Sequence, residues 1–415
     1  MNAHIQSFDE RSLLAFDPTT VLPPESVDAE APVRFAQAFA AELARSATAR
    51  ERANVRPTEE VAILKSSGLV NLLIPERFGG LGGSIATALR VLVEIARGDA
   101  SIGALLGYHY TNAGVGRLFD VEGDAEAIER RSAAGRWFWG NVSQPFARGL
   151  QAVPSAGGGF RLNGVKHWNT GPSLADVTTV IAHRDDAPEV VYAWLPAKRQ
   201  GISYRHDWDH LGLRRTETVS IDFKDVEVKQ DEVFRSSFGP TTSFPPLYVP
   251  IGELYFASFY LGSTYGALDA ALAYTREKGH PVPGSGVDSV TKDPYVLHQY
   301  GEFWSAAEAG TAFLLKVAEE AQDGFDRRRT ITSRERAVLG VRANAVRAFL
   351  SEVGLRVTPR IYELASARAS HNDYGFDRFW RDIRIHTLHD SQAYKLRAVG
   401  DYVLNGEAYE FPAFA

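Results

Sequence analysis

The sequence predicts an α+β protein with three consecutive parts: helices over residues 1–135, a β domain over 136–249 and a second helical domain over 250–415. In the first and last thirds, apolar residues recur with a helical period. In the middle third, short β-branched and aromatic runs alternate with polar or Gly/Pro turns. Helices and strands are therefore segregated along the chain, which favours packed α+β layers over an alternating α/β sheet.

Composition narrows the possible functions. A net charge of -6 provides no basic surface for nucleic acid. The chain has no cysteine, which excludes disulfides, thiolate nucleophiles and cysteine-ligated metals. The apolar stretch Ile251–Tyr274 carries Glu253 and Asp269, so we expect a buried helix and no membrane span. The first 16 residues lack the features of a secretory signal, which predicts a cytoplasmic protein.

The N-terminal third contains two clear helix signals. Thr58 follows a proline and precedes two glutamates, so it is predicted to cap a helix that ends near Gly68. A glycine-rich turn spans Pro75–Gly83, and apolar residues from Ala88 to Ile95 predict a second helix.

The β domain contains a hairpin signal. Asn163-Gly164 separates two short runs of strand type, and this dipeptide is typical of a two-residue turn. Further strands are predicted at Trp137–Val142, Val177–Ala182, Val190–Leu195, Ile202–Tyr204 and Val219–Phe223.

The last third predicts long helices. Thr332 and Glu335 form a capping-box pattern before an amphipathic run, and a Gly/Pro-rich loop over 281–293 separates two other helices. Gly262-Ser-Thr-Tyr-Gly266 resembles a nucleophile motif, but it falls inside a predicted helix and indicates close helix packing.

Sequence motifs leave few cofactors open. No glycine fingerprint of a nicotinamide or phosphate-binding loop follows a strand. His386 and His389 beside Asp390 could share a helix face and bind a metal, but the sequence offers no third ligand, so no metal site is predicted. Asn141 and Ser143 end one aromatic strand, and Trp168 to Thr170 end another, a mixture that suits the polar edge and flat face of a flavin as well as ordinary strand ends.

Five motifs in order resemble the acyl-CoA dehydrogenases: Pro75–Gly82, Val142–Pro145, Leu162–Gly171, Trp208–Arg214 and Arg381–Arg384. The resemblance covers about residues 35–405. It implies an N-terminal helical domain, a central β-barrel or sandwich and a C-terminal four-helix bundle.

Within that superfamily the chain is most similar to the dibenzothiophene monooxygenases, which are two-component flavin enzymes. The similarity rests on Gly107–Ala113, Trp139–Asn141, Leu268–Ala271 with Tyr274–Arg276, Asp293–Tyr295 with Tyr300–Phe303, and Tyr374–Asp390.

The resemblance implies roles for individual residues. Flavin contacts are expected from Asn141, Ser143, Trp168, Thr170 and Trp208, and phosphate or other anion contacts from Arg276, across a subunit interface, and Arg378. His109 and His389 are expected to face the reacting part of the flavin, with Asn141 and Ser143 completing the catalytic set. The expected substrate pocket contains Tyr108, His109, Trp139, Phe146 and Trp208. From its residues alone, His109 would be a hydrogen-bonded core histidine and Arg276 a solvated helix-end cation.

Two departures from the dehydrogenase pattern bear on the expected cofactor and on the expected catalytic residue. The segment Glu363–Arg368 lacks paired glycines that would let backbone approach the pyrophosphate of FAD, which favours FMN. The loop that holds the catalytic glutamate in dehydrogenases reads Leu388-His389-Asp390 here. Asp390 is expected to orient His389, although a role as base stays open.

The predicted function is a monooxygenase that receives reduced FMN from a separate flavin reductase, uses O2 through a flavin hydroperoxide, and oxidises the sulfur of an aromatic heterocycle to sulfoxide and sulfone. His389 would donate a proton or hydrogen bond to the peroxide. The alternatives are a hydroxylase of aromatic carbon or amine nitrogen, an acyl-CoA dehydrogenase with Asp390 as base, and a binding or structural protein without flavin. The resemblance also implies a homotetramer. The sequence leaves open which substrate is used.

Overall fold

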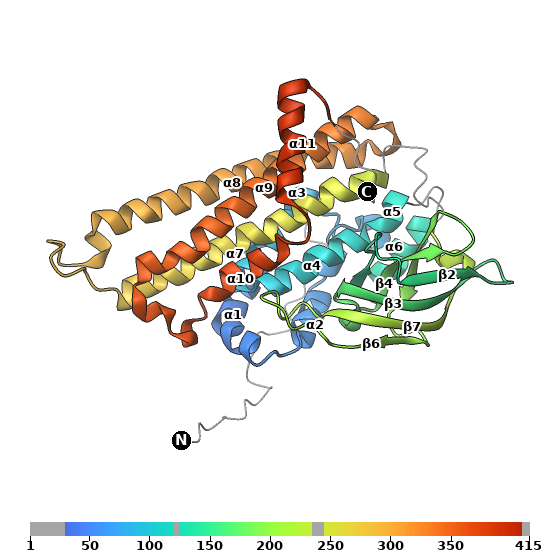
Figure 1. Ribbon diagram of the computed structural model, residues 1–415, viewed down its shortest axis with the longest axis horizontal. Coiled ribbons are helices and arrows are strands. Elements are labelled where there is room, and N and C mark those ends of the chain that lie inside the picture. Colours follow the sequence, from blue (N-terminus) through green and yellow to red (C-terminus); the bar gives the residue numbers. More distant parts are fainter. Residues whose placement is uncertain (1–29, 120–123, 235–244, 409–415) are drawn as a thin grey trace, which may run out of the picture.

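The computed structural model describes residues 30–119, 124–234 and 245–408; the first 16 residues considered above lie outside these ranges. Figure 1 shows a β domain at one end, long helices at the other and shorter helices packed between them. None of the described helices is both long and apolar enough to cross a membrane.

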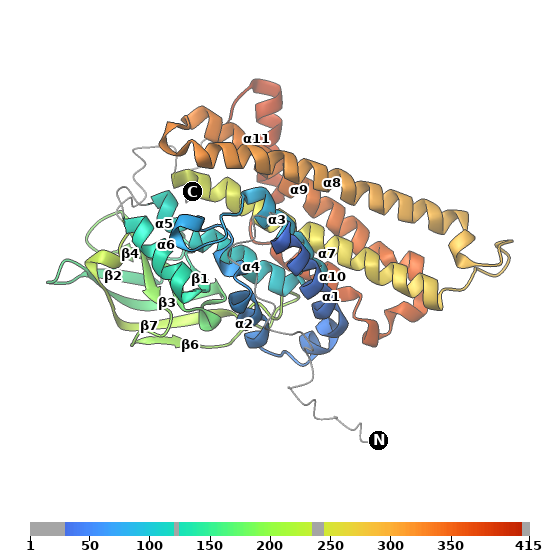
Figure 2. The same cartoon turned by 180° about the vertical axis from the view of Figure 1, so that it is seen from behind.

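The N-terminal helices lie between the sheet and the long helices (Figures 1 and 2). They are α1 (Ala31–Arg52), α2 (Thr58–Ser66), α3 (Ile85–Gly98), α4 (Ala100–Ala113), α5 (Val115–Phe119) and α6 (Asp124–Gly135). Helix α4 contacts strand β1 on one side and α7 on the other, so it joins the two halves of the molecule. The expected cap at Thr58 is wrong: Thr58 is the first helical residue and Pro57 precedes it without a side-chain cap.

The middle of the chain forms one mixed sheet of seven strands with the order β1-β4-β2-β3-β7-β6, and β5 pairs with β4. The strands are β1 (Trp139–Val142), β2 (Leu150–Pro154), β3 (Phe160–Thr170), β4 (Val177–Arg184), β5 (Val190–Pro196), β6 (Ile202–Tyr204) and β7 (Thr218–Val228). Its inner face buries a separate apolar cluster that includes Leu150, Val180 and Phe223.

The predicted hairpin at Asn163-Gly164 is wrong. Both residues lie inside the continuous strand β3, which pairs with β2 on one edge and β7 on the other. The register with β7 shifts between Leu162 and Gly164. Gly164 has φ 127°, and a Cβ there would meet the carbonyl oxygen of Gly149 at 2.0 Å. Pairing on both edges thus overrides the local turn preference, and the Asn-Gly pair forms a bulge.

The C-terminal part contains the long helices α7 (Tyr248–Lys278), α8 (Pro294–Asp326) and α9 (Ser333–Ala365), followed by α10 (Asp377–His386) and α11 (Gln392–Asn405). Thr332 caps α9 and forms the predicted capping box with Glu335. The expected loop after α7 and the expected burial of Ile251–Tyr274 are both confirmed.

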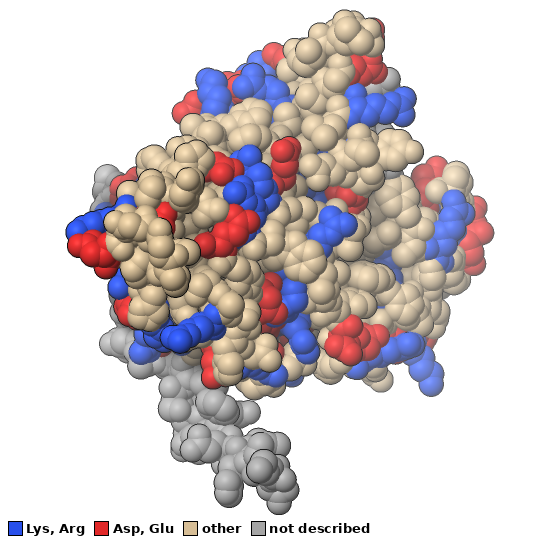
Figure 3. All heavy atoms as spheres, turned by 60° about the vertical axis from the view of Figure 1, so that its left-hand side comes forward, with Lys and Arg blue, Asp and Glu red and all other residues tan. Residues whose placement is uncertain are grey.

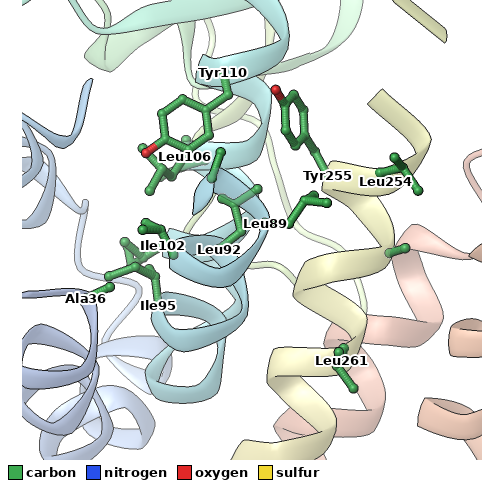
Figure 4. Packing of buried hydrophobic residues seen from close by; sticks show 14 of the residues in the cluster. Ala36, Leu89, Leu92, Ile95, Ile102, Leu106, Tyr110, Leu254, Tyr255 and Leu261 are labelled. Atoms are coloured by element: carbon green, nitrogen blue, oxygen red, sulfur yellow. The ribbon is translucent and has the colours of Figure 1, made fainter. Parts of the chain in front are cut away.

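The core is centred where α3, α4 and α7 meet. Figure 4 shows Leu89 and Leu92 of α3 and Leu106 of α4 in this layer, with Tyr255 of α7 facing them. Gly262 and Gly266 let α7 approach α3, because a Cβ on either residue would meet a carbonyl oxygen of α3 at 2.3 Å. The predicted role of this glycine pair in helix packing is confirmed. On the outer face in Figure 3, acidic and basic side chains alternate in small groups.

Candidate functional site

A cavity of about 880 Å³ opens where the ends of the β strands meet α4, α7 and the segment from α9 to α11. A cavity of this size can hold a drug-sized ligand. The predicted site residues that line it are Tyr108, Asn141, Ser143, Phe146, Trp168, Thr170, Trp208 and His389. These residues come from both halves of the molecule, so only the folded chain forms the cavity.

Strand β1 and the residue that follows it bring two polar side chains to the cavity. The Oδ1 atom of Asn141 is buried and has no hydrogen-bond partner among the described residues. Ser143 lies 2.7 Å from the hydroxyl of Thr179, which in turn donates to the side-chain oxygen of Asn112. A buried unpaired acceptor costs free energy unless a ligand satisfies it, so Asn141 indicates a ligand with an N–H group.

An irregularity in β3 turns Trp168 toward the cavity. The register between β3 and β7 shifts between Lys166 and Asn169, and Trp168 adopts the left-handed φ of 63°. Its ring stacks on His210 at 4.7 Å and is 60% exposed. Bulges of this kind often aim a side chain at a functional site, and backbone strain at a large residue has the same association.

The loop after β6 completes the aromatic wall. The ring of Trp208 lies 5.4 Å from that of Trp168 at an angle of 84°, and its indole N–H donates to the carbonyl of Leu213 at 3.0 Å. The backbone N–H of Leu213 donates to Asp382 of α10 at 2.6 Å. Helix α10 therefore holds the loop that carries Trp208.

Two histidines follow one another on the opposite wall. His386 ends α10, and His389 lies in the turn after it; their rings are parallel, 5.3 Å apart. Half of the His389 side chain is exposed, and the residue lines the cavity. Burial, and then the nearby Arg347 cation, lowers the pKa of His389, so its imidazole is neutral at physiological pH.

Asp390 is held by cations and hardly touches His389. It forms ion pairs of 2.8 Å with Arg347 and with Lys395, whereas its distance to Nδ1 of His389 is 4.0 Å. Glu253 pairs with the same two cations. Burial raises the pKa of Asp390, but the two cations outweigh that effect and the pKa is lowered. A carboxylate in this position is a poor base, and the expected hydrogen bond that orients His389 is not formed.

His109 lies outside the cavity. Its Nε2 donates to the carbonyl of Val70 at 2.8 Å, its Nδ1 accepts from the backbone N–H of Trp139 at 3.0 Å, and its ring stacks on Phe138. Burial lowers the pKa of His109 to about 4. The structure therefore places His109 as a neutral core histidine with both ring nitrogens bonded to backbone.

Three other predicted residues also lie away from the cavity. Trp139 is buried, and its indole donates to Ser132. Arg378 is buried among Asp99, Asp382 and other charges, with its guanidinium 3.9 Å from the ring centre of Phe379. Arg276 is exposed in the last turn of α7. One chain does not bring Arg276 to its own cavity.

The sequence pattern did not reveal the cations that pair with Asp390 or the hydrogen bonds of His386. Arg347 and Lys395 were not assigned a role, and His386 was considered only as a metal ligand. Arg347 lies on the apolar face of the amphipathic run that became α9, and an arginine in such a position was a signal of a buried ion pair. Both ring nitrogens of His386 are bonded to tyrosine hydroxyls, so neither is free for a metal.

The cavity suits a flavin. An isoalloxazine ring needs a flat apolar surface and a few polar groups at its edge. Phe146, Trp168 and Leu388 expose large apolar surfaces to the cavity, while Asn141 offers an unpaired acceptor. The fold and the site together define a flavoprotein with an acyl-CoA dehydrogenase fold.

Comparison with known proteins identifies the family. The N-terminal, middle and C-terminal domains of acyl-CoA dehydrogenases match residues 28–121, 146–226 and 254–393. A dibenzothiophene monooxygenase of Rhodococcus erythropolis is 36% identical, over 95% of this chain and 97% of that protein. A probable FMNH2-dependent monooxygenase, SfnC of Pseudomonas putida, is 32% identical over 89% and 94%.

A solved structure gives the same result. The dibenzothiophene monooxygenase TdsC of Paenibacillus sp. A11-2, in complex with FMN and indole, is 34% identical with a TM-score of 0.89 and covers 93% of this chain and 99% of that one. The chain belongs to the dibenzothiophene monooxygenase family, the flavin-dependent monooxygenases of the acyl-CoA dehydrogenase superfamily.

Proposed function

We propose that the protein binds reduced FMN and uses O2 to oxygenate the sulfur of a small aromatic heterocycle such as dibenzothiophene, first to the sulfoxide and then to the sulfone. One observation carries this proposal. Where a dehydrogenase has its catalytic glutamate, this chain presents a neutral His389 to the cavity, while the neighbouring Asp390 is paired with two cations. Such a site can donate a hydrogen bond to an oxygen, and its one carboxylate, Asp390, is paired too strongly to be a good base for a carbon-bound proton.

In this proposal, the residues that line the cavity contact the flavin, the substrate or the reacting oxygen. Asn141 and Ser143 hold the polar edge of the flavin, and Trp168, Thr170 and Trp208 form the surface beside it. Tyr108 and Phe146 contribute to the substrate wall, and His389 supplies hydrogen bonds to the reacting oxygen. Bound reduced FMN would activate O2 and supply the two electrons of the oxygenation. His109, Trp139 and Arg378 support the walls from behind and are not proposed as contacts.

The flavin is FMN, supplied in reduced form by a separate reductase. The segment Glu363–Arg368, which closes α9 and begins the next turn, has no glycine that would admit a pyrophosphate. SfnC is described as FMNH2-dependent, and TdsC binds FMN together with indole, a small aromatic molecule. These similarities support FMN and a small aromatic substrate here.

A homotetramer is also part of the proposal. Arg276 is exposed on one chain and remote from its cavity, as expected of a cation that holds the flavin phosphate of a neighbouring subunit. The cytoplasmic location expected from the sequence stays a prediction.

Labelled oxygen tests the function. Purified protein, reduced FMN and ¹⁸O2 are incubated with dibenzothiophene, indole or a phenol, and the products are measured by mass spectrometry. We expect one labelled atom in the sulfoxide and two in the sulfone. Label only in indole or phenol would instead establish a hydroxylase. Reduction of bound oxidised flavin by an acyl-CoA, without labelled product, would establish a dehydrogenase.

A further inference from the structure

A buried chain of three side chains ends at the cavity. His386 lies between two tyrosines: its Nδ1 is 2.6 Å from the hydroxyl of Tyr260, and its Nε2 is 3.1 Å from the hydroxyl of Tyr108. Tyr260 is fully buried, whereas Tyr108 lines the cavity. The chain therefore runs from the helix core of α7, through the end of α10, to the site.

Aromatic packing fixes the orientation of the His386 ring. Phe256 and Phe259 lie against it nearly edge-on, with ring centres at 4.7 and 4.6 Å. The ring of His389 stacks on it at an angle of 7°. A ring enclosed in this way cannot rotate to exchange its two nitrogens, so each nitrogen keeps its tyrosine partner.

Burial, and then the positive charges around it, lowers the pKa of His386 well below its usual value. The imidazole is therefore neutral and has one N–H donor and one acceptor nitrogen. Of the two tyrosines, one must donate to the ring and the other must accept from it.

The two distances between His386 and the tyrosine hydroxyls indicate which tyrosine donates its proton and which accepts. Hydroxyl donors make shorter hydrogen bonds than N–H donors, typically about 2.7 against about 2.9–3.0 Å. The 2.6 Å contact fits the Tyr260 hydroxyl donating to Nδ1, and the 3.1 Å contact fits Nε2–H donating to Tyr108. The Arg347 cation opposes the effect of burial on the pKa of both tyrosines, but of the two only Tyr260 also receives a hydrogen bond from Arg347, which makes the Tyr260 hydroxyl the better donor. The proton of Tyr108 is then free to point into the cavity.

We propose that Tyr108 is a further catalytic residue, which donates a proton to the reacting oxygen, and that His386 is the residue that positions its hydroxyl and restores the proton. This inference rests on the proposed function. There, sulfide, O2 and FMNH2 give sulfoxide, water and FMN, so one oxygen atom must leave as water. As the S–O bond forms and the O–O bond breaks, Tyr108 gives its proton to the oxygen atom that leaves as water. Nε2–H of His386 then replaces that proton, and Nδ1 takes one from Tyr260. Protons released as the flavin is oxidised restore the chain, and the net proton count is unchanged.

A binding experiment tests the donor without turnover. The probe is 4-nitrophenol, in a buffer basic enough to keep it ionised, titrated by calorimetry into protein loaded with oxidised FMN. Its uncharged analogue 4-nitrotoluene measures shape alone. We expect wild-type protein to prefer the phenolate, and Tyr108→Phe to lose roughly tenfold of that preference, because a hydrogen bond to a charged acceptor is lost.

Tyr110→Phe is the matched control. Tyr110 lies two residues further along α4 in the packed core (Figure 4), it does not line this cavity, and its hydroxyl donates to the carbonyl of Leu69. Both variants lose one buried phenol hydroxyl from the same helix. If Tyr108→Phe keeps the wild-type preference for the phenolate, the donor assignment is wrong.

His386 is tested by rescue. His386→Leu removes the N–H that bonds to Tyr108, while His386→Gln keeps an amide donor on a side chain of similar reach. We expect the leucine variant to lose the phenolate preference and the glutamine variant to regain part of it. Equal loss in both, with unchanged unfolding midpoints, would overturn the positioning role. If wild-type protein gives no labelled sulfur product yet Tyr108→Phe loses the preference, the donor assignment stands and the proposed substrate is wrong.

Discussion

Two regions of the molecule contain the same chemical groups in different surroundings. In the sealed cluster, Arg50 and Arg215 pair with Glu60 and Asp99 between α1, α2 and α4, and all four are buried. The cavity cluster contains Arg347, Lys395, Glu253 and Asp390, of which Asp390 is partly exposed at the cavity.

The buried helices and the cavity also each contain a histidine. His109 lies on α4 with both ring nitrogens bonded to backbone, and His389 faces the open cavity. Residue type alone therefore does not distinguish a group that lines the cavity from one that is buried in the core. The two histidines differ in exposure: half of the His389 side chain is exposed at the cavity, whereas His109 is fully buried.

The largest expected effect is on the sealed cluster. Glu60→Gln leaves two buried arginines with one carboxylate, and breaking a buried ion pair costs about 3–5 kcal/mol. Urea unfolding should show this loss in the free energy of unfolding. Glu59→Gln, at an exposed position in the first turn of the same helix, is the control and should change it little. If Glu60→Gln and Glu59→Gln lower the free energy of unfolding equally, the sealed cluster does not contribute the stability expected of buried ion pairs.

The next effect is a pH dependence that arises from His109. Its pKa is about 4 when folded and about 6.5 in a free chain, so only the unfolded state takes up a proton between these values. Stability is fully present above pH 6.5 and falls by about 3 kcal/mol as the pH decreases to 4. His109→Gln can keep both backbone hydrogen bonds but cannot titrate.

Urea unfolding measured between pH 4 and pH 6.5 checks the sign and the size of this change in the free energy of unfolding. The slope should be smaller in His109→Gln, whereas the exposed control His280→Gln should retain the wild-type slope. A wild-type slope in the His109 variant would show that this residue is not the buried neutral imidazole described above.

His389 should affect turnover and leave stability unchanged. We expect His389→Ala to reduce labelled sulfoxide formation roughly 100-fold, the lower range for loss of a proton-transfer group. Because half of its side chain faces the cavity, the free energy of unfolding should stay close to that of wild type. His280→Ala, in the loop after α7, is the activity control. If His389→Ala instead lowers the free energy of unfolding and leaves turnover unchanged, His389 has a structural role like that of His109.

The smallest effect is expected at Asp390. Asp390→Asn leaves Glu253 to pair with both cations, so we expect a loss of about 1 kcal/mol, well below that of Glu60→Gln. Sulfoxide formation should fall less than roughly tenfold, whereas loss of an essential base costs about 10²–10⁴-fold. If Asp390→Asn lowers sulfoxide formation by about 10²-fold or more, Asp390 acts as a proton acceptor.

The sequence predicted the parts of the site that lie in short ordered motifs. Asn141, Trp168, Trp208 and His389 each belong to such a motif, and all four line the cavity. The Asn163-Gly164 hairpin was wrong because the turn preference is local, while pairing with β2 and β7 depends on distant strands.

Contacts between distant residues could not be predicted in this way. Tyr108 and His386 are 278 residues apart, and His386 and Tyr260 are 126 apart. Nothing in the local sequence distinguishes Tyr108 from Tyr110, although one hydroxyl meets a histidine at the cavity and the other meets the backbone of Leu69. The direction in which each side chain points follows from packing that only the folded chain contains.

The hydrogen bond from Leu213 to Asp382 joins the two walls of the cavity. Leu213 also accepts from the indole of Trp208, and Asp382 lies one helical turn before His386 on α10. The loop that carries Trp208 and the helix that carries His386 are thus joined by hydrogen bonds through Leu213. We therefore expect a bound ring that displaces Trp208 to shift His386 as well, so that the width of the ring and the position of the Tyr108 hydroxyl are coupled.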